Sequence, residues 1–199
     1  MSSSSGGRRP YHHGNLRQAL LDAAMDLLSV TPAAQLSLRE LARAAQVSHA
    51  APYHYFTDRQ GLIRAAGVEA MRRLLQAQQA AVAAEDSPRG RLLALGHAYV
   101  RFAAREPHAF ALVFDPQYCK PGTPTEDMAP LITANEALLA ACVDEAQRFG
   151  VLPPGDTGPI ATALWGTVHG LAQLVMAGHV PLPEAEAALS ALLPSQQPR

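Results

Sequence analysis

The fold is decided by residues 36–62, which read LSLRELARAAQVSHAAPYHYFTDRQGL. Ser37 stands three residues before Glu40, the spacing of a capping box, in which the hydroxyl and the carboxylate each bond to a free backbone N–H. Leu36 and Leu41 stand where they can form a hydrophobic staple. The pattern therefore predicts a short helix that begins directly after Ser37.

A tight turn and a second short helix are expected next. Gln46 and Val47 form the turn, and Ser48 can cap a helix over residues 49–55. Pro52 falls in or near the first turn of that helix, where the missing backbone donor is tolerated. The stretch thus predicts two short helices joined by a tight turn.

Longer helices flank this pair. The first begins where Asn15 and Gln18 can form a second capping box, and it ends at Thr31–Pro32. Its apolar residues recur at helical spacing on one stripe, namely Leu16, Leu20, Ala23, Leu27 and Leu28. The last helix of this region begins at a cap at Thr57 and runs past Leu74.

The composition favours helix throughout the 199 residues. Apolar residues make up 48 % and charged residues 17 %, which excludes a disordered or fibrous chain. Alanine is abundant and β-branched residues are sparse, so no strand is predicted. The expected fold is all-α, with a flexible basic arm at 1–14, a three-helix head at 15–75 that contains the helix-turn-helix, and a larger helical body at 76–199.

Charge is unevenly distributed along the chain, although the net charge is only −1. Residues 1–75 contain nine Arg and five acidic residues, whereas residues 76–199 contain seven basic and twelve acidic residues. A basic head on an acidic body is typical of a protein whose head binds a polyanion. Solvated helix faces that differ by chance are the alternative.

The helix-turn-helix carries side chains that suit the major groove of DNA. A short second helix with small residues at its start can enter the groove and reach base edges, while the polar groups around it contact phosphates. The candidate DNA-binding residues are Arg8, Arg9, Ser37, Arg39, Ser48, His49, Ala50, Ala51, Tyr53, His54 and Arg59. An ordinary helical hairpin is the alternative that periodicity leaves open.

These residues resemble a known family. Residues 42–62 are similar to the DNA-binding signature of TetR-type transcriptional regulators, with an alanine-rich helix, a turn into Val-Ser, an aromatic pair ending in Phe and a basic residue shortly after. Residues 8–24 also resemble the entry segment of that family. Two positions depart from the pattern, because Gln46 stands where the family usually has Gly and Arg59 replaces the usual Lys. A left-handed backbone at Gln46 costs about 1 kcal/mol.

The resemblance implies a mode of action. A homodimer is expected to bind a palindromic double-stranded DNA operator and to be released from it, as a repressor, by a small apolar or amphipathic effector. An activator of the same fold is one alternative. An all-helical small-molecule sensor or carrier that binds no DNA is another.

The C-terminal body resembles one subgroup of the family. Residues 164–171, LWGTVHGL, are similar to the Trp–His–Gly motif of a TetR-type C-terminal regulatory domain. Two glycines one turn apart leave a helix face without side chains, so that a neighbouring helix can approach closely. We expect dimerisation through residues 159–178 and 183–193. The candidate interface residues are Gly166, Gly170, Leu171, Leu174 and Leu189.

Most aromatic residues outside the head lie in the middle of the body. The candidate ligand-binding residues are Tyr99, Phe102, Phe110, Phe114, Trp165 and His169. An apolar pocket with a few polar groups suits a small molecule, and the resemblance implies such a pocket. A plain aromatic core is the alternative, and for His169 we favour a core histidine bonded to a neighbouring carbonyl.

Other function classes find no support in the sequence. The motifs of α/β-hydrolases, P-loop proteins, zinc proteases and dinucleotide enzymes are missing, so no catalytic residue, cofactor or metal site is expected. Residues 157–183 contain no Asp, Glu, Lys or Arg, but their polar residues, glycines and prolines argue against a membrane span. The first residues lack the apolar stretch of a signal peptide, so we expect a cytoplasmic protein.

Overall fold

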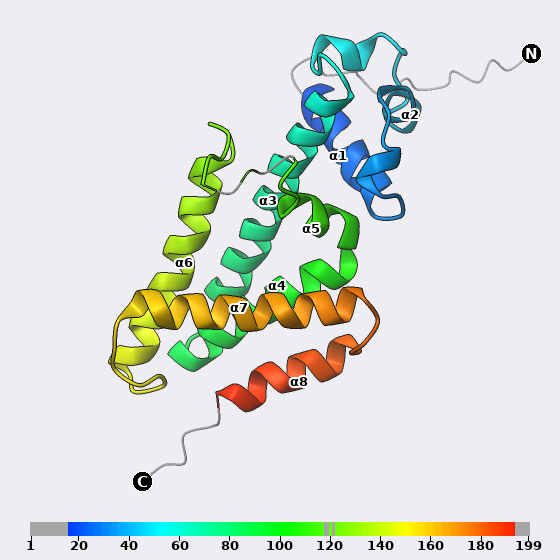
Figure 1. The fold of residues 1–199 in the computed structure, drawn as a ribbon. Helices are drawn as coiled ribbons and strands as arrows, with labels where there is room; N and C mark the ends of the chain where they lie inside the picture. The colour runs from blue at the N-terminus through cyan, green and yellow to red at the C-terminus, as the bar shows by residue number, and fades with distance from the viewer. Residues whose placement is uncertain (1–15, 118–119, 121, 194–199) are drawn as a thin grey trace, which may run out of the picture.

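The computed structural model describes residues 16–117, 120 and 122–193. This part of the chain contains eight α-helices, two short 3-10 helices and no strand, so the predicted all-α fold is confirmed (Figure 1). The elements follow in the order α1 (Leu16–Leu28), η1 (Ala33–Gln35), α2 (Leu38–Ala44), η2 (Ala51–His54), α3 (Arg59–Ala83), α4 (Pro88–Arg105), α5 (Pro107–Val113), α6 (Ala129–Arg148), α7 (Thr157–Met176) and α8 (Leu182–Leu192).

The head is formed by α1, α2 and the N-terminal part of α3. Leu20, Leu41 and Leu62, one from each of these helices, are fully buried in its core. The predicted start of α2 is confirmed, because the Ser37 hydroxyl oxygen accepts from the Glu40 N–H at 3.2 Å. The same hydroxyl donates to the Glu40 carboxylate at 2.9 Å. A local capping pair therefore fixes where α2 begins.

The second short helix differs from the prediction. Instead of an α-helix over residues 49–55, the chain forms a 3-10 helix at Ala51–His54. Its hydrogen bonds span three residues, as from the Tyr53 N–H to the Ala50 carbonyl at 3.2 Å. Pro52 has no N–H to donate to an α-helical ladder at this point, which favours the tighter winding.

The turn between the two short helices has the predicted backbone. Gln46 adopts a φ of 55°, the left-handed conformation that the family pattern assigns to Gly. The cap of α3 is shifted by one residue from the prediction, because Asp58 rather than Thr57 holds the N-cap position. The Asp58 carboxylate accepts from the Gly61 N–H at 2.6 Å.

Of two other predicted caps, one is not formed and one lies outside the described residues. The N-cap residue of η2 is Ala50, with no side-chain cap, so Ser48 does not hold that position. Asn15, the predicted cap of α1, lies outside the described residues, and the side-chain amide of Gln18, its expected partner, donates to Asp22 and Glu69. Gln18 thereby joins α1 to α3.

The long helix α3 connects the head to the body. It runs unbroken for 25 residues and continues through residue 75, the expected boundary between head and body. In the body, α4 packs against α3, α6, α7 and α8, and α7 lies across α4 with α8 beside it (Figure 1). Tyr99, Val100 and Phe110 are buried at the centre of these contacts.

The short helix α5 is a second link between body and head. It packs against α3 and α4, and it also contacts α1 and η1. Its residues Ala109 and Phe110 are fully buried. Movements of α5 can therefore reach the head directly as well as through α3.

A membrane-spanning role finds no candidate in this fold. Among the described helices, none combines the length and the apolar character that a bilayer crossing requires.

Candidate nucleic-acid interface and ligand cavity

The outer surface of the head presents polar side chains around η2. Ser48 and His49 are exposed on the turn before it, together with Ala50. Tyr53, with 61 % of its surface exposed, and His54 follow on η2 itself. Five of the predicted DNA-binding residues are thus accessible on one short segment.

Ala51 departs from the prediction. Its side chain is only 8 % exposed and lies among the buried residues of the head, beside Pro52. A methyl group that faces the core cannot meet a thymine methyl in the groove. The role predicted for Ala51 as a base contact is therefore corrected to a packing role.

Arg59 is exposed, but its guanidinium is bonded to backbone carbonyls of the head. Its Nε donates to the Leu36 carbonyl at 2.8 Å. Its Nη2 donates to the carbonyls of Ala33 at 3.0 Å and Ala34 at 2.6 Å. The guanidinium therefore ties η1 and the start of α2 to α3, and this corrects the expectation that it is directed at a phosphate.

The remaining predicted phosphate contacts lie at different places. Arg39 is exposed on α2, and Ser37 is half-buried because its hydroxyl caps that helix. Arg8 and Arg9 lie outside the described residues. Of this group, Arg39 is the basic side chain that the structure describes as exposed, in the first turn of α2.

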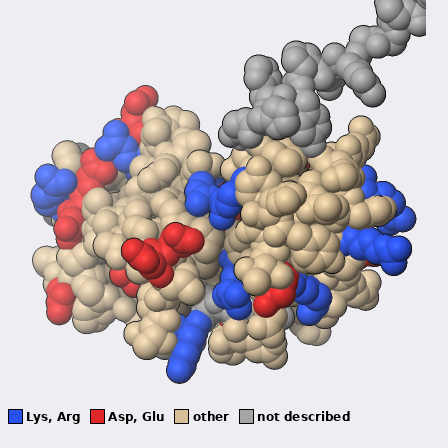
Figure 2. Space-filling model, turned by 90° about the horizontal axis from the view of Figure 1, so that it is seen from above, with Lys and Arg blue, Asp and Glu red and all other residues tan. Residues whose placement is uncertain are grey.

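The charge asymmetry predicted from the sequence is visible on the surface. In Figure 2, Lys and Arg side chains mark the outer edge of the head, on the right of the view, while most of the acidic side chains lie over the body on the left. A basic outer edge of the head favours approach to a polyanion.

A cavity of about 580 Å³, which we call the ligand chamber, lies among α3, α4, α5, α6 and α7. Most of its wall is apolar, with Met71 and Leu74 from α3 and Ile132 from α6. Polar groups come from Asn135 and Thr162, and charged groups from Lys120 and Glu136. This volume and this mixture are typical of small-molecule sites.

Tyr99 forms the centre of a hydrogen-bonded group at the chamber wall. Its hydroxyl lies 2.9 Å from His169 Nδ1 and accepts from Trp165 Nε1 at 3.4 Å. Burial raises the pKa of Tyr99 above its ordinary value and lowers the pKa of His169. A protonated phenol that donates to a neutral imidazole is consistent with both shifts.

The predicted ligand-binding residues separate into two layers. Tyr99, Phe114 and Trp165 line the chamber. Phe110 supports them from behind, with its ring 5.2 Å from that of Tyr99 in an edge-to-face arrangement. His169 also lies in this second layer, with its ring 4.8 Å from that of Phe114.

Two details differ from the predictions for this group. Phe102 is buried, with 7 % of its surface exposed, and is not among the residues that line the chamber. His169 is bonded to a hydroxyl rather than to a carbonyl. Its place in the aromatic cluster agrees with the favoured interpretation of His169 as a structural histidine.

Several lining residues were not predicted, because they are contributed by helices far apart in the sequence. In the sequence, Met71 and Leu74 have the spacing of ordinary core residues of α3, and Ile132 has that of a core residue of α6. Asn135 could have been identified from the sequence, since it is a polar residue on a mainly apolar helix. Its Nδ2 donates to the Oε1 of Gln78 on α3 at 2.7 Å.

The predicted dimer face is open in the single chain. Around Gly166 and Gly170 on α7, no described atom lies within 4 Å of the place that a side chain would occupy. Leu174, with 42 % of its surface exposed, and the half-buried Leu171 follow on the same helix. Leu189 differs, because it is 6 % exposed and packs against Val100 inside the chain. The predicted interface role of Leu189 is therefore corrected to a packing role within the chain.

The described part of the chain offers no metal site. No group of three or more His, Cys, Asp or Glu side chains lies close enough together there to hold an ion.

Comparisons with known protein families match both parts of the chain. The family "Bacterial regulatory proteins, tetR family" matches residues 20–66. The family "Tetracyclin repressor-like, C-terminal domain" matches residues 92–194. A search of curated proteins finds no match.

Solved structures show the same fold. A protein with unknown function from Rhodococcus sp. RHA1 is 38 % identical, with a TM-score of 0.79, and the match covers 94 % of this chain and 97 % of that one. The TetR family transcriptional regulator PfmR from Thermus thermophilus is 19 % identical, with a TM-score of 0.66 and coverage of 90 % and 99 %. The transcriptional regulator FadR from Bacillus subtilis, in complex with stearoyl-CoA, is 15 % identical, with a TM-score of 0.66 and coverage of 89 % and 95 %.

Proposed function

Since the chain belongs to the TetR family of bacterial regulatory proteins, we propose that it is a homodimeric repressor that a small-molecule effector releases from a palindromic operator. The observation that carries the proposal is the position of the ligand chamber. Two of its walls, α3 and α5, are the helices that reach the head. A ligand that displaces either wall can change the placement of the DNA-binding surface.

The proposal assigns separate roles to the exposed residues of the head. His49 and Ala50, with Ser48, enter the major groove and contact base edges, while Tyr53, His54 and Arg39 contact phosphates. The arm at residues 1–14 adds phosphate contacts through Arg8 and Arg9. Because each subunit presents the same surface, two-fold symmetry requires a palindromic operator.

The dimer is proposed to form through the uncharged face of α7. Gly166 and Gly170 allow the partner helix to approach, and Leu171 and Leu174 supply apolar area. Trp165, with 46 % of its surface exposed, lies on the same helix. Trp165, His169 and Gly170 also support placement of the C-terminal domain in the Trp–His–Gly subgroup.

The effector is proposed to be apolar or amphipathic, because most of the chamber wall is apolar. The likeness to a regulator whose structure holds stearoyl-CoA agrees with this class of molecule. Activation rather than repression by the same fold is the second candidate. We propose that the protein acts in the cytoplasm and catalyses no reaction.

Selection of duplexes from a random DNA pool tests the proposal. We expect a palindromic sequence bound by two chains, and we expect His49→Ala to weaken that complex by about 1–3 kcal/mol for each lost base contact. A protein that selects no sequence, or one whose His49→Ala variant selects and binds the same operator equally well, would contradict it.

A further inference from the structure

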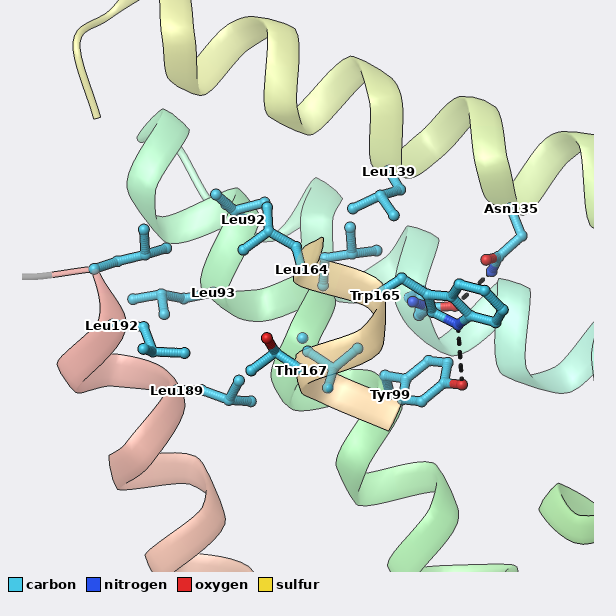
Figure 3. Close-up of a pocket in the computed structure, with 15 residues that line it drawn as sticks. Leu92, Leu93, Tyr99, Asn135, Leu139, Leu164, Trp165, Thr167, Leu189 and Leu192 are labelled. Atoms are coloured by element: carbon cyan, nitrogen blue, oxygen red, sulfur yellow. Dashed lines mark hydrogen bonds between the residues drawn. The ribbon is translucent and has the colours of Figure 1, made fainter. Parts of the chain in front are cut away.

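A second, narrower cavity adjoins the ligand chamber. It has a volume of about 50 Å³ and lies among α4, α6, α7 and α8. Leucines from these helices supply most of its wall, as Figure 3 shows. We call it the leucine slot, and its wall includes Leu92, Leu93, Leu164, Leu189, Leu192 and Leu193.

The chamber and the slot meet at a shared wall. Tyr99, Asn135, Leu139 and Trp165 line both cavities. In Figure 3, Trp165, Tyr99 and Asn135 stand together at one end of the slot, while Leu93 and Leu192 stand at the other end. The chamber and the slot are therefore adjacent where Trp165 stands.

Polar groups are concentrated at the shared wall. The bonds from Trp165 Nε1 to the Tyr99 hydroxyl and from Asn135 to Gln78 are both at this end (Figure 3). The charged residues among the described lining, Lys120 and Glu136, belong to the chamber. The polar part of a ligand is thus best accommodated in the chamber or at the shared wall, and its apolar part in the slot.

The far end of the slot is held in place by a hydrogen bond. Arg89 Nε, on α4, donates to the carbonyl of Leu193 at 2.7 Å, at the C-terminal end of α8. Leu193 itself is only 7 % exposed. The slot is therefore bounded at its far end by helices that are joined to each other.

From this arrangement we infer that the effector site has two compartments and takes an amphipathic molecule with an unbranched alkyl chain. The chamber holds the polar end and most of the chain, and the slot takes the chain terminus beyond Trp165. A volume of about 50 Å³ is less than two water molecules occupy in the liquid, at about 30 Å³ each. It suits the end of a straight chain and excludes a ring.

The inference rests on the proposed function in calling the ligand an effector. Binding of the ligand, however, can be measured without DNA. The probes are straight-chain alkanols and alkyl carboxylates from hexyl to hexadecyl, used below their micelle concentrations. Trp165 is the only tryptophan of the chain and lines both compartments, so its fluorescence reports binding. Calorimetry provides a second measurement of the dissociation constant.

Two variants fill the slot and one matched control reduces the chamber. Leu164→Phe and Leu93→Phe add a ring to residues that line the slot, whereas Ile132→Phe adds a ring to a residue that lines the chamber. Each buried methylene strengthens binding about 4-fold. Because the slot has room for about two such groups, each slot variant should weaken the longest bound chains about 15-fold and leave shorter chains unaffected.

The control and the probes separate the outcomes. We expect Ile132→Phe to weaken chains of every length, and a chain ending in a cyclohexyl ring to gain nothing from the slot. The inference is overturned if no alkyl probe binds to wild type, or if the two slot variants show the chain-length profile of wild type. If long chains bind as expected but leave operator affinity unchanged, the two-compartment site stands and release by effector fails.

Discussion

Removal of the Arg59 side chain should destabilise the head rather than remove a contact with DNA. The three hydrogen bonds from its guanidinium, at 2.8, 3.0 and 2.6 Å, join α3 to η1 and to the segment before α2. A hydrogen bond to a charged group contributes about 1.5–3 kcal/mol at most. Because Arg59 is exposed and water competes for these carbonyls, we expect Arg59→Ala to lower the free energy of unfolding by about 2 kcal/mol in total.

Thermal unfolding measures this effect. For a chain of this size, 1 kcal/mol shifts the midpoint by about 2–4 °C, so Arg59→Ala should lower it by about 4–8 °C. Arg59→Lys should lose part of this amount, since the three N–H groups of an ammonium share one nitrogen and cannot replace donors at both Nε and Nη2. Arg64→Ala, an exposed arginine on the same helix, is the matched control and should stay within about 0.5 kcal/mol of wild type.

Salt dependence of DNA binding distinguishes the two roles of Arg59. A lost phosphate contact would flatten the slope of log K against log salt by about two units per dimer. A structural role leaves that slope unchanged in the variant. The reasoning would be refuted if Arg59→Ala unfolds at the same midpoint temperature as wild type while the slope of log K against log salt flattens.

Three further predictions concern other parts of the molecule. The first concerns the phosphate contacts, which are removed in Arg39→Ala, Tyr53→Ala and His54→Ala. Each variant should bind all DNA sequences more weakly and flatten the slope of log K against log salt by up to about two units per dimer, as measured by titrations at several salt concentrations. Unchanged slopes in all three variants would contradict the phosphate assignment. Gly166→Leu and Gly170→Leu fill space that is open in the single chain, so each should weaken the dimer by about 1–3 kcal/mol and give a monomer on dilution in light scattering; intact dimers at low concentration would place the interface elsewhere. Burial lowers the pKa of His169, so the unfolded chain takes up a proton first as the pH falls below about 6.5. The stability advantage of wild type over His169→Gln in denaturant unfolding should therefore shrink from pH about 7.5 to about 5.5, and an advantage that stays constant would rule out this linkage.

The features that the sequence predicted correctly depend on interactions between near neighbours. Ser37 caps α2 through a residue three positions away, and Gln46 adopts the left-handed backbone that its turn requires. Capping and turn geometry involve few residues, so a short stretch of sequence contains the whole signal. The all-α fold follows in the same way from helical spacing of apolar residues.

The features that were missed depend on contacts between distant residues. The bonds of Arg59 reach back 23 to 26 residues, and nothing in the residues near Arg59 indicates them. Leu189 is an apolar residue on a helix that was expected to form the interface, but packing against α4 buries it within the chain. Ala51 opens a 3-10 helix where an α-helix was expected, and this change of winding alters the direction of its side chain, which is buried beside Pro52. The chamber combines residues of five helices, so aromatic content alone could identify only part of its wall.

The coupling between the ligand chamber and the DNA-binding head is tested most directly by one pair of titrations. A compound that releases the protein from its selected operator is titrated with and without that operator, and Trp165 fluorescence gives the dissociation constant in each case. Linkage requires operator and effector to weaken each other by the same factor, typically about 5- to 150-fold. We predict equal factors in this range. Equal affinities of the compound with and without operator would show that ligand and DNA are bound without being coupled, and would contradict the account.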